Sequence, residues 1–171
     1  DIDGHVYPTV TIDNQEWMAE NLNTKHYANG DSIQELASDS IWEITENPGY
    51  AYYSNDSARQ ESYSYGKLYN YKAISDSRNV CPTGWHVSSK KEWEKLIECL
   101  GGKFEAGAKL KHLGDPTTTI WNAPNEELST NETSFTALPQ GARIKTGEFE
   151  NQRFFAYFWG ENDVPTIYSL S

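Results

Sequence analysis

The sequence has little methionine or cysteine, few basic residues and no long apolar run. Of its 171 residues, one is Met and two are Cys, and 14 Lys and Arg stand against 25 Asp and Glu, for a net charge of −11. Such a charge repels nucleic acids and anionic membranes, so we expect neither as a partner. No stretch approaches the ~20 apolar residues of a membrane span. The composition favours a soluble, exported protein.

Two cysteines are too few for a disulfide scaffold. Cys81 and Cys99 could pair, and closing that loop would stabilise the protein by about 3 kcal/mol. We favour the alternative that Cys99 is a buried thiol, because it lies beside the apolar face of a predicted helix.

Sequence signatures of catalysis are missing as well. The four histidines lack metal-ligand spacing, and there is no nucleophile elbow, phosphate loop or dinucleotide fingerprint. We therefore expect no enzymatic activity and no cofactor. Calcium binding stays an open alternative, because the surplus of carboxylates could supply its ligands.

Aromatic residues are abundant: they make up 13% of the chain, with six Trp and eleven Tyr. Each buried aromatic side chain removes roughly 150–250 Å² from water, so we expect most of these rings to form a core. The same composition is common in extracellular sugar-binding and adhesive domains. The length suits a single domain over residues 1–171.

The best-specified local structure is the stretch CPTGWHVSSKKEW, residues 81–93. Residues 82–84, Pro-Thr-Gly, are typical of a turn, and residues 85–87 are typical of a short strand. Ser89 and Glu92 have the spacing of a helix capping box. One apolar face follows at helical spacing, formed by Trp93, Leu96, Ile97 and Leu100. The stretch therefore predicts a turn, a short strand and a capped helix that ends at Gly101-Gly102.

The remaining elements are predicted from shorter patterns. We expect a hairpin in residues 1–22 with Val6, Val10 and Ile12 on one side, a turn at Asp1-x-Asp3-Gly4, and a loop over residues 54–64. Helices are predicted at residues 66–74 and 104–113, and strands near residues 50–53, 143–144, 147–149 and 154–159. Strands that flank a helical middle indicate the α+β class with antiparallel sheet.

The order of these motifs resembles the Fibrobacter succinogenes major paralogous domain, a family of exported, often lipid-anchored bacterial surface proteins. The blocks that carry the resemblance span nearly the whole chain: DGHVYPTVTIDNQEWMAENL, GKLYNY, CPTGWHVSSKKEW, AGAKLK, the W-N-x-x-x-N pattern, SFTALPQGAR and AYFW.

That family is similar in turn to the C-type lectin-like fold, in the branch of the formylglycine-generating enzyme. The resemblance implies two main helices plus a short third, an antiparallel sheet and a long loop-rich region that often carries ligands. Family members usually continue further past the F-W block, whereas this sequence stops soon after Trp159; we expect either that the last strand or strands of the family are missing here or that this member closes its sheet differently. The cysteine pair of the enzyme branch is absent.

A candidate ligand site follows from the physics of sugar binding, which needs an exposed aromatic platform beside amide or charged groups. The sequence places such residues in and after the loop-rich region: Trp121, Asn122, Asn125, Asn131 and Arg143. The acidic residues of a calcium-bridged lectin site are missing around Ala123-Pro124-Asn125, so a calcium-free site is expected. The competing interpretation is that Trp121 fills the core and the asparagines cap turns.

Two functions remain open from sequence. The first is a non-catalytic bacterial cell-surface module that binds a polysaccharide or another surface ligand in adhesion. The alternative is a structural or assembly protein, whose aromatic surface contacts a surface protein or a second copy by self-association.

Overall fold

The computed structural model describes residues 1–62, 64–114, 120–122, 129–161 and 166–171. The chain forms two compact units, and each is built from segments that are not contiguous in sequence. Unit 1 comprises Asp1–Val6, Asn21–Val87 and Ala142–Glu150, and unit 2 comprises Tyr7–Glu20, Ser88–Gly141 and Asn151–Ser171.

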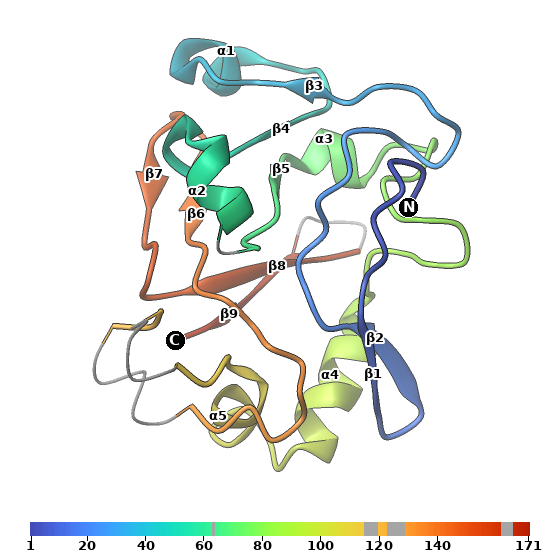
Figure 1. Ribbon diagram of the computed structural model, residues 1–171, viewed down its shortest axis with the longest axis vertical. Helices are drawn as coiled ribbons and strands as arrows, with labels where there is room; N and C mark the ends of the chain where they lie inside the picture. The colour runs from blue at the N-terminus through green and yellow to red at the C-terminus, as the bar shows by residue number, and fades with distance from the viewer. Residues whose placement is uncertain (63, 115–119, 123–128, 162–165) are drawn as a thin grey trace. The chain divides into compact units, whose positions relative to one another are not determined.

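Unit 2 begins with a β-hairpin. Strands β1 (Thr9–Ile12) and β2 (Gln15–Met18) pair antiparallel, with Val10 opposite Trp17 (Figure 1). Asp13 in the turn has a φ of 53°, a left-handed conformation that Asp tolerates better than most residues. The hairpin prediction is thus confirmed. Val6 does not join it, because it precedes β1 and is exposed.

Helix α4 (Lys90–Cys99) starts with the predicted capping box. The Ser89 hydroxyl accepts from the Glu92 backbone N–H, and the Glu92 carboxylate accepts from the Ser89 backbone N–H at 2.7 Å. The turn before the helix is also confirmed, since the Trp85 N–H donates to the Pro82 carbonyl at 2.9 Å. Residues 85–87 form no strand, so that prediction was wrong.

The prediction of an apolar face on α4 is confirmed. Trp93, Leu96 and Leu100 are buried in the unit 2 core, but Cys99 is exposed and forms no disulfide with Cys81. The expectation of a buried Cys99 was wrong, because Cys99 falls just outside the buried stripe.

Helix α5 (Ala106–Leu110) occupies the middle of the third predicted helix. Ala106 and Leu110 are buried in the same core as α4. Phe104 and Leu113, which the helical pattern placed inward, lie beyond the two ends of the helix and are exposed.

Strands β8 (Ala156–Gly160) and β9 (Thr166–Leu170) form an antiparallel pair in which Tyr157 faces Ser169 and Trp159 faces Ile167 (Figure 1). The strand predicted at 154–159 is confirmed, two residues later than expected. A further strand, β9, follows the AYFW block.

Unit 1 contains a three-stranded sheet in the order β3-β4-β5. Strand β4 (Gly49–Ala51) lies in the middle, parallel to β3 (Gln34–Glu35) and antiparallel to β5 (Leu68–Tyr69). A separate antiparallel pair is formed by β6 (Ala142–Arg143) and β7 (Phe149–Glu150).

The helix predicted over residues 66–74 is wrong in its first half. Residues Leu68–Tyr69 form β5, and helix α3 (Tyr71–Ile74) begins only after Asn70. The Asn70 side chain accepts from the Ala73 N–H at 2.9 Å, which caps the helix at that point.

The loop predicted over residues 54–64 is also wrong. A 3-10 turn, η1 (Tyr53–Asn55), is followed by helix α2 (Ser57–Ser62). The Asp56 carboxylate accepts from the Arg59 N–H at 3.0 Å, a capping contact that the sequence analysis overlooked. Helix α1 (Asp39–Ile44) was not predicted either, and none of its residues is buried.

The unit 1 core is mainly tyrosine, in contrast to the tryptophan-rich core of unit 2. Its buried members are Tyr27, Ile33, Tyr50, Tyr52, Tyr69, Ala73, Val80 and Cys81. The Asp1–Gly4 turn of this unit is present, with the Gly4 N–H donating to the Asp1 carbonyl at 3.2 Å.

The fold class is therefore mixed α+β, with several small sheets and short helices. Within the described residues, no helix is long and apolar enough to cross a membrane.

Candidate functional site

Strand β8 separates a buried face from an aromatic outer face. Ala156 is buried in the core, and the Phe158 ring packs against Trp93 with the ring centroids 5.3 Å apart. Because successive side chains of a strand point to opposite faces, Tyr157 and Trp159 lie on the other side. We call Phe155, Tyr157 and Trp159 the outer aromatic row.

Two rings of this row form a pair. The rings of Phe155 and Tyr157 are stacked, with centroids 5.6 Å apart and planes inclined by 16°. Both side chains are half-buried. Opposite Tyr157 across the sheet lies Ser169, which is exposed. The pair thus presents apolar ring surface beside a hydroxyl group.

Asn151 adds an amide to the same place. Its Nδ2 donates to the Tyr157 hydroxyl at 2.9 Å. The backbone of Asn151 has a φ of 62°, and its carbonyl accepts from the Phe155 N–H at 3.0 Å. This turn returns the chain into β8 and fixes the amide beside the tyrosine. A ring face flanked by an amide and a hydroxyl can stack on a sugar ring and hydrogen-bond its hydroxyl groups.

None of the described residues that were predicted for the ligand site belongs to the outer aromatic row. Trp121 is 0% exposed in the unit 2 core, and the Lys111 ammonium stands 5.3 Å from its ring centroid. A ring with no exposed face offers no stacking surface in this conformation. Trp121 therefore fills the core, as the competing interpretation held.

The predicted asparagines have different surroundings where the structure describes them. The Asn131 side chain accepts from the Thr136 N–H at 3.0 Å and so closes a turn. The backbone N–H of Asn122 donates to the Arg153 carbonyl at 2.8 Å. Asn125 lies outside the described residues. A ligand role for these side chains stays a prediction.

Arg143 belongs to unit 1, and its side chain is 0% exposed. The guanidinium lies over the rings of Trp42 and Phe149, each centroid 4.7 Å away. It donates to backbone carbonyls of Leu36, Ala37 and Gly147. These contacts give Arg143 a structural role that the sequence did not indicate.

The Arg143 guanidinium also pairs with the Asp39 carboxylate at 2.6 Å. Asp39 is largely exposed, so this ion pair extends from the buried arginine to the surface.

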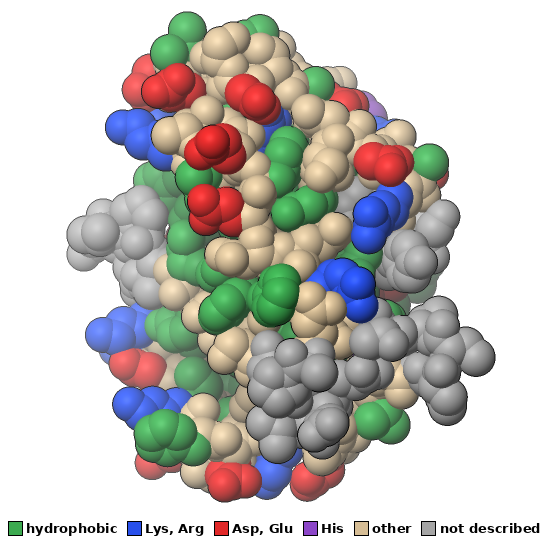
Figure 2. Space-filling model, turned by 90° about the vertical axis from the view of Figure 1, so that its left-hand side faces the viewer, with side chains coloured by type: hydrophobic (Ala, Val, Ile, Leu, Met, Phe, Trp, Pro, Cys, Tyr) green, Lys and Arg blue, Asp and Glu red, His purple; other side chains and the backbone are tan. Residues whose placement is uncertain are grey.

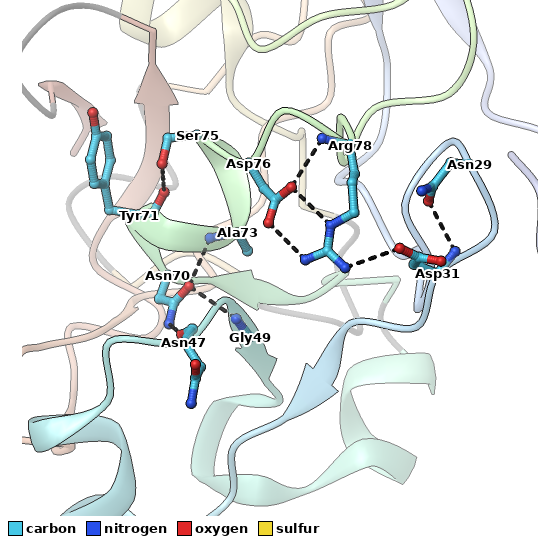
Figure 3. A network of polar contacts seen from close by, with 10 residues as sticks. All are labelled: Asn29, Asp31, Asn47, Gly49, Asn70, Tyr71, Ala73, Ser75, Asp76 and Arg78. Carbon is cyan, nitrogen blue, oxygen red and sulfur yellow. Dashed lines mark hydrogen bonds and ion pairs between the residues drawn. The ribbon is translucent and has the colours of Figure 1, made fainter.

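A second cationic centre of unit 1 is the Arg78 network drawn in Figure 3. Arg78 donates to Asp76 through Nε at 2.9 Å and Nη2 at 2.7 Å, and its Nη1 reaches Asp31 at 3.2 Å. The Arg78 hydrogen bonds lower the pKa of Asp76 to about 2. The Arg78 guanidinium also lies 4.1 Å from the ring centroid of Tyr27, so the network packs against the tyrosine core of unit 1.

Metal-binding groups are not evident in the part of the chain that the structure describes: no cluster of three or more His, Cys, Asp or Glu side chains could hold a metal ion there. Asp3 lies in the predicted Asp1–Gly4 turn, and its side chain binds residues of its own unit. Its carboxylate accepts from Thr24 and Lys25 and contacts the His26 ring at 2.5 Å.

The strand that carries Tyr157 and Trp159 was predicted from the sequence, but the outer aromatic row was not predicted as a site. Little in the sequence indicates the row, because Phe154 and Phe158 are aromatic as well and the run shows no alternation. The stacking and the Asn151 contact depend on the turn before β8, which the pattern does not reveal.

Comparison with known proteins supports the resemblance stated from the motifs. The family model described as the Fibrobacter succinogenes major domain matches residues 10–166. No curated protein and no solved structure matches the chain, and the family itself is of uncharacterised function. Since the family model covers most of the sequence, the chain belongs to the Fibrobacter succinogenes major domain family.

Proposed function

We propose that this chain is a non-catalytic carbohydrate-binding module of the bacterial cell surface, exported and lipid-anchored, that serves adhesion. The stacked pair of Phe155 and Tyr157, with the Asn151 amide on the tyrosine hydroxyl, is the observation that carries the proposal. A C-type lectin-like arrangement of the elements belongs to the same proposal.

The chemistry of the pair favours a sugar over a purely apolar ligand. Stacked rings offer an apolar surface to the C–H groups of a pyranose, and the amide and hydroxyl groups beside them can bind its hydroxyls. The net charge of −11 repels acidic glycans. A neutral polysaccharide is therefore the proposed ligand, bound without a cofactor.

Binding to a glycan array and to insoluble cellulose tests the proposal. We expect Tyr157→Ala and Phe155→Ala to weaken glycan binding by about tenfold or more, equivalent to ~1.4 kcal/mol, because each removes half of the stacked pair. Glycan binding is also measured with a chelator and with added calcium. We expect equal binding in the two conditions, because the proposed site needs no cofactor.

Phe104→Ala provides the matched control. Phe104 lies in the same unit and is 89% exposed, but its nearby polar partner is the Lys103 ammonium, 5.3 Å from the ring centroid, and it has no stacked aromatic neighbour in the described chain. Its loss should leave binding unchanged. Equal losses from Phe104→Ala and Tyr157→Ala would point to nonspecific hydrophobic adsorption.

The assembly alternative rests on exposed apolar side chains. Ile44, Val6 and Phe104 are among the exposed large hydrophobics, and Figure 2 shows hydrophobic side chains on one face between acidic and basic ones. If no glycan binds and sedimentation detects self-association that Phe104→Ala or Ile44→Asp abolishes, the assembly function replaces the carbohydrate one.

A further inference from the structure

Lys67 is a buried amine in unit 1. The residue is 5% exposed, and its Nζ lies 5.4 Å from the Tyr50 ring centroid and 5.2 Å from that of Tyr52. Buried lysines need close partners, because desolvation of the ammonium is unfavourable. Here the partners are two ring faces and one asparagine.

That asparagine is Asn23. The Lys67 Nζ donates to the Asn23 carbonyl at 2.5 Å and also to its side-chain Oδ1. The Asn23 carboxamide, whose Cγ is an electrophilic carbon, is thus in direct contact with the amine.

Surrounding contacts hold the two segments together. The Lys67 N–H donates to the Leu22 carbonyl at 3.1 Å, and the Asn21 Nδ2 donates to the Tyr65 carbonyl at 3.0 Å. Gly66 has a φ of 72°, and a Cβ there would come within 2.8 Å of the Leu22 carbonyl oxygen. The close approach of these segments fixes the amine against the amide, which favours reaction between them.

Burial also changes the charge of the amine. Desolvation lowers the pKa of Lys67 to about 8 against the opposing attraction of carboxylates such as Asp3 and Glu35. About a tenth of the molecules then carry a neutral, nucleophilic amine at pH 7, compared with fewer than one in a thousand for an ordinary lysine.

We propose that Lys67 and Asn23 form an intramolecular amide cross-link between Nζ and Cγ. The site is independent of the outer aromatic row and of its proposed ligand.

The reaction is a condensation that needs no oxidant. The lone pair of the neutral Lys67 Nζ attacks the Asn23 Cγ, and the new C–N bond forms while the bond from Cγ to Nδ2 breaks. A proton from Nζ passes to Nδ2, which leaves as ammonia.

Mass spectrometry of the intact, denatured chain tests the cross-link. After incubation in mildly alkaline buffer, we expect a mass lower than that of the sequence by one ammonia. A digest should contain a branched peptide that joins the Asn23 and Lys67 segments. The branched peptide distinguishes the cross-link from cyclisation of an asparagine onto its own backbone, which also releases ammonia.

Variants locate the bond. Lys67→Arg and Asn23→Ala should keep the full mass of their sequences and yield no branched peptide, whereas Lys72→Arg should still lose ammonia. Lys72 is a suitable control because it is an exposed lysine of the same unit, paired with Glu46 at 2.7 Å. Wild-type protein that keeps its full mass and gives no branched peptide after incubation overturns the proposal, whatever the variants do.

Discussion

Buried cationic side chains are the main feature of this protein at the scale of single residues. Lys67, Lys111 and Arg143 are all buried. Each lies over one or two aromatic rings and donates to backbone carbonyl oxygens. Ring faces and carbonyls together replace the water that a cation loses on burial. Part of the aromatic content of the sequence therefore serves buried cations.

Arg143→Lys tests this role. Lysine keeps the charge but loses the planar group that reaches several acceptors at once, so the buried carbonyl of Leu36 would be left with a poorer partner. We expect the free energy of unfolding to fall by about 2–4 kcal/mol, measured by urea denaturation.

Arg59→Lys on α2, an exposed arginine, is the control for the Arg143 experiment and should change stability little. Equal stability of Arg143→Lys and the parent protein would mean that the planar guanidinium of Arg143 does not contribute to the free energy of unfolding.

The roles of single residues were the hardest to predict. The sequence marks Trp121 and Arg143 as chemically suited to ligands, but suitability does not determine exposure. Trp121 belongs to a core cluster with residues from distant segments such as Ile12 and Ala156, and Arg143 contacts Ala37 and Asp39. Burial produced by such distant neighbours leaves no local pattern.

At the scale of elements, local hydrogen bonds decide where helices begin. The Ser89 and Glu92 box starts α4, Asn70 starts α3, and Asp56 caps the segment that contains α2. Only the Ser89 and Glu92 box was recognisable as a helix start in the sequence pattern, and α4 is the helix whose position was predicted best.

Ser89→Ala should destabilise the protein by about 1 kcal/mol, because it leaves the Glu92 N–H without its side-chain acceptor at the helix start. Thermal unfolding followed by circular dichroism measures the loss. Ser88→Ala is the neighbouring control, since Ser88 contributes a backbone carbonyl, which accepts from the Glu161 N–H, and the substitution preserves it. Equal shifts in the two variants would count against the capping box as a stabilising feature.

Whether a segment forms a strand or a helix could be predicted only where the sequence pattern was long. The apolar period of α4, from Trp93 to Leu100, covers about two turns and was predicted correctly, as was the β1–β2 hairpin with its Asp13-Asn14 turn. Residues 66–74 also fit a helical spacing, but Leu68 and Tyr69 instead pair with β4. Pairing with a strand nearly twenty residues earlier outweighed the weak local preference.

At the scale of the whole molecule, the two units share one chain that passes between them repeatedly. Unit 1 takes three segments and unit 2 takes three, and each has its own hydrophobic cluster. The α+β class was predictable from the order of elements. The division into a tyrosine core and a tryptophan core was not, because both residue types occur throughout the sequence.

The prediction of a single domain is tested by the cooperativity of unfolding. We expect amide protection in β4 of unit 1 and in α4 of unit 2 to be lost at the same denaturant concentration, because neither unit is a continuous stretch of chain. Peptide-resolved hydrogen exchange across a urea series measures both. Two separate midpoints would show that the units unfold independently.

The reach of Arg143 has a consequence for synthesis on the ribosome. Its guanidinium donates to the carbonyl of Leu36, which precedes it by 107 residues. At the usual elongation rates, on the order of 5 to 20 seconds pass between the synthesis of these two residues. During that interval the Leu36 carbonyl lacks this donor, and Trp42 lacks the cation that covers its ring. The nascent chain in this state is the form that chaperones would meet.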